Sequence, residues 1–211
     1  MEKKVYKTEQ EAFWAGEFGD EYLKRNDGVL AVASNLAFFG QALKRCTSRI
    51  QSMIEFGANI GLNQKALQLL LPEASQHAIE INPKAAARLG EVIPPPHIFQ
   101  TSILDFTPPR TWDLVLIKGV LIHINPEFLP QVYKALYEST ARYLLLGEYY
   151  NPTPVEVEYR GHNSRLFKRD FCGEMLDFYP DLKLVDYGFV YRRDTQFPDD
   201  DMNWFLVEKR A

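Results

Sequence analysis

The sequence contains only two cysteines, Cys46 and Cys172, in 211 residues. They are far apart, no C-x-x-C pair occurs, and no histidine stands at metal-ligand spacing from either of them. A disulfide framework needs several cysteines, and a zinc site needs closely spaced ligands. We therefore expect two free thiols and no metal site.

Clusters of positive charge are also scarce. The 24 Lys and Arg residues are outnumbered by 28 Asp and Glu residues, which gives a net charge of -4. Cations occur only in short groups such as KRC, FKRD and YRRD. Because binding to a nucleic-acid backbone depends on clustered Lys and Arg, we expect no nucleic-acid partner.

Long hydrophobic runs are absent too. No apolar stretch reaches the ~18 residues of a transmembrane helix, and the segment MEKKVYKTEQEAFW lacks the apolar run of a signal peptide. We expect a cytoplasmic protein with no membrane partner. The length suits one substantial hydrophobic core.

What the chain does contain is a glycine turn within the segment Arg49 to Glu73, RIQSMIEFGANIGLNQKALQLLLPE. The letters MIEF predict a buried strand, and the leucine spacing in LNQKALQLLL predicts a helix. Gly57 and Gly61 permit a sharp turn, and Asn59 tolerates a left-handed backbone. The free N–H groups at the start of the helix point to the same place. The turn therefore predicts a ligand-binding site, and glycines that serve only close packing are the alternative.

The spacing of this turn separates two classes of ligand. A dinucleotide fingerprint, G-x-G-x-x-G, starting at Gly57 would need glycine at the positions of Asn59 and Leu62. The pattern E-x-G-x-G-x-G matches at Glu55, Gly57 and Gly61, and departs only at Asn59. In this pattern the sequence resembles the class I S-adenosylmethionine (SAM) methyltransferases. The resemblance implies SAM as the cofactor, bound at Glu55, Gly57, Asn59 and Gly61.

An acidic residue lies near the end of the next predicted strand. The letters AIEI form a short strand that contains Glu80, and the pair Asn82-Pro83 predicts the start of a helix. Glu80 lies 19 residues beyond Gly61 (80 − 61), close to the ~20 expected between a glycine turn and the acid that binds ribose hydroxyls. We expect Glu80 to bind the ribose of the cofactor.

Two further strand ends supply candidate cofactor contacts. HIFQTSILDF predicts a third strand, and in the resembling family the residues after it lie beside the adenine; here they are Ser102, Ile103 and Asp105. A fourth strand, Asp113 to Ile117, ends at Lys118, where ligands bind in open α/β sheets. Amine methyltransferases that act on nucleic-acid bases often carry [DNS]PP[YFW] here. This chain has KGVL instead, which disfavours that chemistry.

Three segments also resemble one subfamily, the methylases associated with pseudaminic acid biosynthesis: EAFWAGEFGDEYLKRN (Glu11 to Asn26), KGVLIHINP and YRGHNSRLFKRDFCGEM. The resemblance implies that the first segment covers the cofactor site. From the aromatic residues of this segment we expect Trp14 and Tyr22 to contact the substrate. A helical cap that only completes the core is the alternative. We place an N-terminal helical cap at residues 1–48 and the SAM-binding domain at 49–211.

The residues after the fifth predicted strand, Tyr143 to Leu146, are dense in aromatic and basic groups. Arginines can bind an anionic acceptor, and tyrosines can pack on a sugar ring. The predicted acceptor contacts in this region are Tyr149, Tyr150, Tyr159, Arg160, Arg165 and Lys168. A solvated helix face with ion pairs is the alternative. The later run RDTQFPDDDMN predicts a loop that keeps the chain soluble.

Alternating strands and helices predict an α/β protein with a doubly wound, seven-stranded Rossmann-like sheet. Its last two strands, Leu182 to Tyr191 and Trp204 to Lys209, have no predicted helix between them. The predicted function is methyl transfer from SAM to a small polar acceptor, a sugar or nucleotide-sugar-like metabolite.

An alcohol acceptor needs a general base, whereas a neutral amine can react without one. The candidate bases are His123, Glu148 and His162. An NAD-dependent oxidoreductase and a non-catalytic SAM-binding protein are the alternative functions. The sequence leaves the oligomeric state open.

Overall fold

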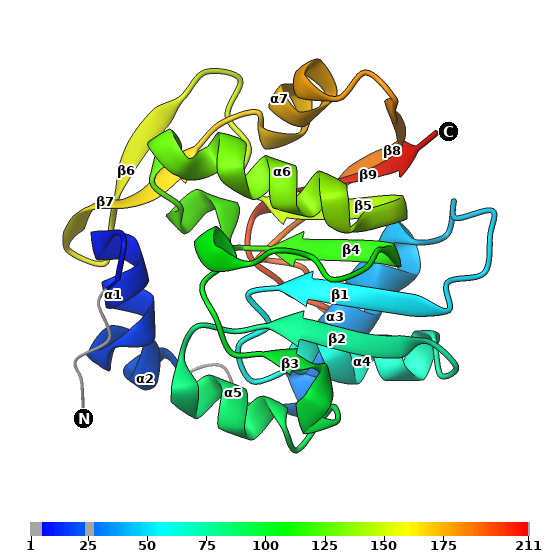
Figure 1. Cartoon of the computed structure of the whole chain (residues 1–211), viewed down its shortest axis with the longest axis horizontal. Coiled ribbons are helices and arrows are strands. Elements are labelled where there is room, and N and C mark those ends of the chain that lie inside the picture. The colour runs from blue at the N-terminus through cyan, green and yellow to red at the C-terminus, as the bar shows by residue number, and fades with distance from the viewer. Residues whose placement is uncertain (1–5, 24–27, 211) are drawn as a thin grey trace.

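The structure, a computed structural model, describes residues 6–23 and 28–210. Residues 1–5 and 24–27, which belong to the predicted cap and include the end of its segment at Asn26, and the last residue, Ala211, lie outside the described residues. The centre of the molecule is a seven-stranded sheet in the order β3-β2-β1-β4-β5-β9-β8 (Figure 1). Its strands are β1 (Ser52–Phe56), β2 (Ser75–Ile79), β3 (Ile98–Phe99), β4 (Trp112–Lys118), β5 (Thr140–Glu148), β8 (Leu182–Val190) and β9 (Met202–Lys209).

Neighbouring strands from β3 to β5 are parallel, whereas β9 is antiparallel to both β5 and β8. This arrangement confirms the predicted doubly wound, seven-stranded α/β fold. The third strand is shorter than predicted. The helices are α1 (Glu9–Ala15), α2 (Glu17–Leu23), α3 (Val29–Ala42), α4 (Leu62–Leu70), α5 (Pro83–Leu89), α6 (Leu129–Ser139) and α7 (Phe171–Phe178).

Helices cover both faces of the sheet, because successive side chains of a strand point to opposite faces. In β4, Val115 and Ile117 pack in one core cluster with residues of α6 and α7. Leu114 and Leu116 pack in a second cluster with residues of α3 and α4 on the other face. Because both faces of β4 are buried, its sequence contains a continuous run of apolar residues. Polar side chains that bind a ligand are therefore expected at the ends of the strands.

The start of α5 follows the prediction from the Asn-Pro pair. The side-chain oxygen of Asn82 accepts hydrogen bonds from the backbone N–H groups of Lys84 at 2.9 Å and Ala85 at 3.0 Å. Pro83 occupies the first turn of the helix, where its missing N–H group costs no hydrogen bond. The chain after β2 is therefore fixed, and Glu80 lies directly before this helix.

The segment after β5 differs from the prediction. It forms a separate antiparallel hairpin of two strands, β6 (Val155–Tyr159) and β7 (His162–Lys168). Arg160 and Gly161 at the hairpin turn have φ angles of 51° and 83°. Two successive positive φ angles give the turn whose twist matches paired strands. The interpretation of this basic segment as a solvated helix face is therefore wrong.

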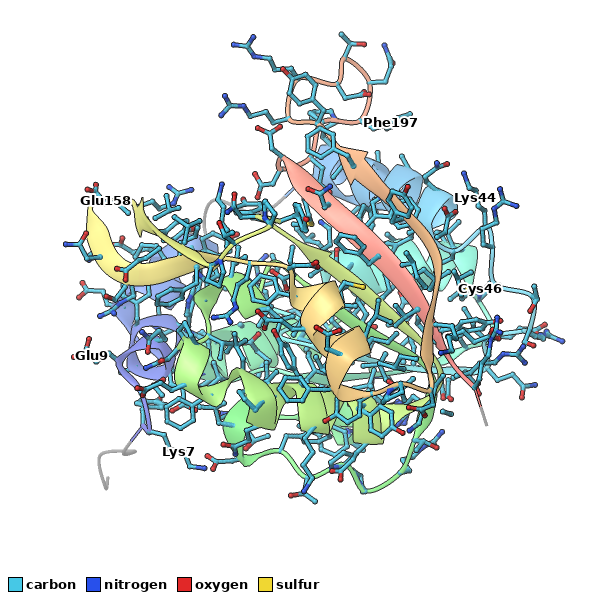
Figure 2. The ribbon with its side chains drawn as sticks, turned by 90° about the horizontal axis from the view of Figure 1, so that it is seen from above. Lys7, Glu9, Lys44, Cys46, Glu158 and Phe197 are labelled. Atoms are coloured by element: carbon cyan, nitrogen blue, oxygen red, sulfur yellow. The ribbon has the colours of Figure 1, made fainter. Side chains whose placement is uncertain are left out.

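The helices α1 and α2 pack beside this hairpin rather than on the sheet. The side chain of Gln10 donates to the carbonyl oxygen of Ser164 at 2.9 Å, and Arg165 pairs with Glu9 at 3.1 Å. Figure 2 shows Glu9 and Glu158 of the hairpin on the same side of the molecule. By contrast, α3 belongs to the core. The domain boundary at residue 48 stays a prediction.

Within the described residues, no helix is long and apolar enough to cross a membrane. The same residues contain no group of three His, Cys, Asp or Glu side chains placed to hold a metal ion. Cys46 and Cys172 are not bonded to each other. Burial raises the pKa of Cys46 to about 11 and that of Cys172 to about 12, so neither thiol ionises readily at neutral pH.

Candidate functional site

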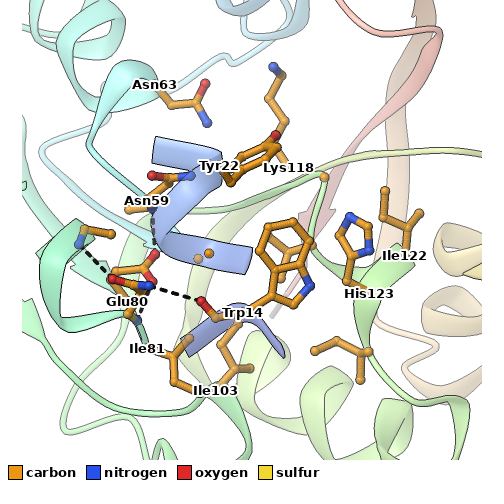
Figure 3. Close-up of a pocket in the computed structure, with 18 of the residues that line it drawn as sticks. Trp14, Tyr22, Asn59, Asn63, Glu80, Ile81, Ile103, Lys118, Ile122 and His123 are labelled. Carbon is orange, nitrogen blue, oxygen red and sulfur yellow. Dashed lines mark hydrogen bonds between the residues drawn. The ribbon is translucent and has the colours of Figure 1, made fainter. Parts of the chain in front are cut away.

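A cavity of about 600 Å³ lies at the carboxyl ends of β1, β2 and β4. This is the edge of an open α/β sheet at which ligands bind, and the volume is within the range of small-molecule sites. Its walls come from the glycine turn, α1, α2, α3 and the loop between β8 and β9. Figure 3 shows Glu80, Asn59, Lys118, Trp14 and His123 around this space.

The glycine turn has the backbone that the sequence predicts. Gly57, Asn59 and Gly61 have φ angles of 79°, 50° and 83°, all in the left-handed region. A Cβ atom on Gly57 would lie 2.7 Å from a methyl group of Val120, and one on Gly61 would lie 2.8 Å from a methyl group of Leu89. Both positions therefore need glycine for space as well as for conformation. Gly57 and Asn59 line the cavity, and Gly61 supports the turn from behind.

The carboxylate of Glu80 faces this turn from the end of β2. One oxygen accepts a hydrogen bond from the backbone N–H of Asn59 at 2.7 Å, and the other accepts from the backbone N–H of Asn82 at 2.7 Å. Burial raises the pKa of Glu80. A carboxylate has about four acceptor positions. Glu80 thus keeps acceptor capacity toward the cavity that it lines.

Glu55 lies beneath the turn instead of in the cavity lining. Its side chain is fully buried and accepts hydrogen bonds from Asn63 Nδ2 at 2.6 Å and Gln64 Nε2 at 3.1 Å. Burial raises the pKa of Glu55 to about 7. These contacts join the end of β1 to the first turn of α4. The role of Glu55 is therefore to fix the turn that would hold the ligand.

The predicted adenine contacts lie at one end of the cavity. Ile103 lines it, together with Ile81. Ser102 also lines it, but its hydroxyl donates to the carboxylate of Glu11 on α1. Asp105 pairs with Lys7 at 2.5 Å and is not among the described residues of the lining. The structure therefore brings Ser102 and Ile103 to the site and leaves Asp105 outside it.

Lys118 lies at the opposite end of the cavity. Its Nζ atom is 3.1 Å from Asn35 Oδ1 on α3 and 3.0 Å from Asp199 Oδ2 in the loop between β8 and β9. Asp199 and Asp200 both line the cavity. The interpretation of the RDTQFPDDDMN run as a loop that only keeps the chain soluble is therefore wrong.

His123 is the predicted base that lines the cavity. Its Nδ1 lies 2.6 Å from the carbonyl oxygen of Arg165, so this nitrogen carries the proton and Nε2 has the lone pair. Burial lowers the pKa of His123 to about 4. The imidazole is therefore neutral near pH 7. Its ring lies 4.7 Å from that of Trp14 and 4.9 Å from that of Tyr159.

The other two predicted bases do not reach the cavity lining among the described residues. Glu148 is buried, and its carboxylate accepts hydrogen bonds from the backbone N–H groups of Val120 at 3.0 Å, Leu121 at 2.9 Å and Ile122 at 3.3 Å. It fixes the loop that carries His123. His162 is exposed on the hairpin and packs edge-on against Phe13. The structure places neither side chain in the described lining, and a role as base stays a prediction for both.

The predicted acceptor residues divide into two groups. Trp14, Tyr22, Tyr149 and Tyr159 line the cavity and form an aromatic wall beside His123. Burial and the neighbouring Asp200 raise the pKa of Tyr149, so its hydroxyl keeps its proton. The second group lies outside the described part of the lining and consists of Tyr150, Arg160, Arg165 and Lys168.

The basic members of that second group have other contacts. Arg160 lies over the ring of Tyr159 at 5.6 Å, and Lys168 lies over the ring of Tyr149 at 5.3 Å. Arg165 pairs with Glu9 and contributes its backbone carbonyl to the site. Arg160 and Lys168 thus contact two rings of the aromatic wall, and the anion-binding rim stays a prediction.

Sequence reasoning missed several polar residues of the lining, among them Glu11, Asn35, Asp199 and Asp200. Glu11 has a local signal, because Thr8 and Glu11 form a capping box at the start of α1. Asn35, Asp199 and Asp200 have no local sequence signal, because the residues that they contact at the site are distant in sequence.

No family model matches the sequence, and no curated protein sequence matches it. Solved structures do match the fold. A SAM-dependent methyltransferase of Leishmania major aligns with a TM-score of 0.65 and 16% identity, over 94% of this chain and 80% of that one. Magnesium protoporphyrin IX methyltransferase of Synechocystis PCC 6803, solved with bound SAM, aligns with a TM-score of 0.64 and 13% identity, over 98% of this chain and 100% of that one.

A third match is the 1,6-didemethyltoxoflavin-N1-methyltransferase of Burkholderia thailandensis, solved with 1,6-didemethyltoxoflavin and S-adenosylhomocysteine. It aligns with a TM-score of 0.68 and 12% identity, over 96% of this chain and 87% of that one. At such low identities the likeness establishes a shared fold, which is the Rossmann-like fold of class I methyltransferases.

Proposed function

We propose that this protein is an enzyme that transfers a methyl group from SAM to a hydroxyl group of a small polar acceptor. The observation that carries the proposal is that the glycine turn, Glu80 and His123 face one cavity. The methyltransferases of the same fold, which were solved with SAM or S-adenosylhomocysteine, support the choice of cofactor.

The residues at the turn suit a nucleoside with a ribose. Glu80 uses one acceptor position on each oxygen for a backbone N–H group, and the remaining lone pairs can accept from two adjacent ribose hydroxyls. Ile81 and Ile103 offer apolar surface for a flat base at the same end. The lack of Cβ atoms at Gly57 allows the ligand to lie close to the backbone. These residues would hold SAM.

His123 would act as the general base for a hydroxyl acceptor. SAM, when bound, supplies a methyl group that is already activated by its sulfonium charge. The protein then has to align the acceptor oxygen and exclude water. As that oxygen forms its bond to the methyl carbon it becomes acidic, and His123 Nε2 takes its proton. A neutral imidazole is a suitable base even with a low pKa, because the acceptor oxygen has become acidic by the time its proton is transferred.

We propose a sugar-like acceptor as the finer assignment. The resemblance of three segments to the methylases associated with pseudaminic acid biosynthesis supports it. The wall of Trp14, Tyr22, Tyr149 and Tyr159 also supports it, because aromatic faces pack on sugar rings and tyrosine hydroxyls bind sugar hydroxyls. Negative charge on the acceptor is not needed, since the arginines and lysine of the hairpin support this wall from outside.

Two binding titrations and one turnover assay test the proposal. Calorimetry should give saturable binding of SAM and none of NAD. Incubation with radiolabelled SAM and a cell metabolite extract should then yield S-adenosylhomocysteine and a labelled, hydroxyl-methylated product. Binding of NAD in place of SAM would favour an oxidoreductase. Tight SAM binding with no turnover in any extract fraction would favour a non-catalytic SAM-binding protein.

A further inference from the structure

An ion pair inside the cavity lies apart from the residues proposed to bind the nucleoside. Lys118 Nζ and Asp199 Oδ2 are 3.0 Å apart, and their side chains are only 10% and 17% exposed. Figure 3 shows Lys118 in the upper part of the view and Ile81 and Ile103 in the lower part. Charges held this far from water are costly unless each has good partners.

The partners at this end of the cavity are incomplete within the described residues. Asp199 Oδ2 lies within ion-pair distance of Lys118 but is buried without a hydrogen bond. Ser34 Oγ and Asn59 Oδ1 are also buried without a hydrogen-bond partner. All three belong to residues that line the cavity. Buried polar atoms in folded proteins are almost always satisfied. Several unsatisfied atoms in residues that line one cavity point to a polar ligand.

We infer that Lys118 and Asp199 bind the amino-acid end of SAM, with Lys118 on its carboxylate and Asp199 on its ammonium group. The inference rests on the proposed function. The nucleoside at Glu80 and Ile103 leaves the other end of the molecule to the wall that carries Lys118. An amino acid is a zwitterion, and Lys118 and Asp199 present the two complementary charges to it.

Asn35 completes the carboxylate site. Its Oδ1 accepts from Lys118 Nζ at 3.1 Å, so its amide N–H groups remain to donate. Lys118 has three donors and uses one of them on Asn35. A carboxylate placed between Lys118 and Asn35 would therefore meet donors from both side chains. The loop between β8 and β9 thereby becomes part of the cofactor site.

The test compares three adenosine ligands that carry different charges at the amino-acid end, and each affinity is compared between the variant and the wild type. S-adenosylhomocysteine carries both charges, decarboxylated SAM keeps only the ammonium group, and 5′-methylthioadenosine has neither. Calorimetry on Asp199→Asn should show binding of the first two weakened by about tenfold to hundredfold. The affinity for methylthioadenosine should be the same in this variant as in the wild type. Lys118→Met should weaken S-adenosylhomocysteine and leave decarboxylated SAM nearly unchanged.

Asp201→Asn is the matched control. Asp201 lies in the same loop and pairs with Arg192 at 3.3 Å, but is not among the described lining residues. Its change should leave all three affinities within about twofold of the wild type. An equal loss for all three ligands in Asp199→Asn would mean that the pair only holds the loop, and would overturn the inference.

Unchanged affinities in a folded Asp199→Asn variant would overturn the inference as well. Folding is checked by the Tm of each variant without ligand. If the wild type binds none of the three ligands, the proposed function itself fails. Failure of the inference alone looks different: the wild type binds all three ligands, and the variants lose affinity for all of them equally or for none.

Discussion

Glu80 Oε2 lies 2.7 Å from the backbone nitrogen of Asn59, so the acid after β2 holds the turn after β1. The second oxygen of Glu80 holds the start of α5 through Asn82 in the same way. One carboxylate therefore sets the relative position of two loops and also lines the cavity. Preorganisation of this kind lowers the entropy that a ligand loses on binding.

Glu80→Ala should weaken SAM binding by about tenfold to hundredfold, because charged hydrogen bonds each contribute roughly 1.5 to 3 kcal/mol. Calorimetry measures the affinity. Glu91→Ala, at an exposed position after α5, is the control and should change nothing. An unchanged SAM affinity in folded Glu80→Ala would remove Glu80 from the cofactor site.

The activity should be insensitive to pH across the range in which a solvated histidine titrates. Burial lowers the pKa of His123 to about 4, so Nε2 keeps its lone pair at every pH above about 5. We expect kcat/KM to be flat from pH 6 to 8 and to fall only in more acidic buffer. His123→Gln should lower kcat by about a hundredfold or more at all of these values. A rise in wild-type kcat/KM centred near pH 6.5 would contradict this prediction.

Glu148 should make the protein less stable as the pH rises toward neutrality. Burial raises its pKa in the folded protein from 4.5 to about 7. Between these values the folded state binds more protons than the unfolded chain, so the contribution to stability is present at low pH and is lost as the pH rises through 7. Glu148→Gln cannot ionise, and its Tm should depend less on pH between 5 and 8. Glu138→Gln, on the surface of α6, should keep the wild-type dependence.

The turn and the acid at the cofactor site could be predicted because their causes are local. Gly57 and Gly61 have positive φ, and Glu80 follows a strand at the spacing that the fold imposes. Lys118 could also be placed, since a residue at the carboxyl end of a buried strand must lie at that edge. For such residues the backbone alone determines the position.

Residues whose role depends on contacts between distant segments could not be predicted. Asn35 and Lys118 are 83 positions apart, and nothing in either segment indicates the other. Glu148 is a predicted base, yet its oxygens accept hydrogen bonds from three N–H groups of the chain after β4. The hairpin was missed although VEVEY in β6 alternates apolar and polar residues, because HNSRLFK in β7 does not, and the two strands pair with each other outside the main sheet.

The position of β9 determines when this site can form during synthesis. Although β9 is the last strand in the chain, it is inserted between β5 and β8. Until it is made, β5 and β8 have no common neighbour, and Asp199 cannot meet Lys118. In a chain that ends before residue 199, β1 to β4 are complete but the cavity lacks the lining residues Asp199, Asp200 and Met202. The contribution that we infer for Asp199 to cofactor affinity would therefore be acquired late, and a ligand titration on stalled chains would measure it directly.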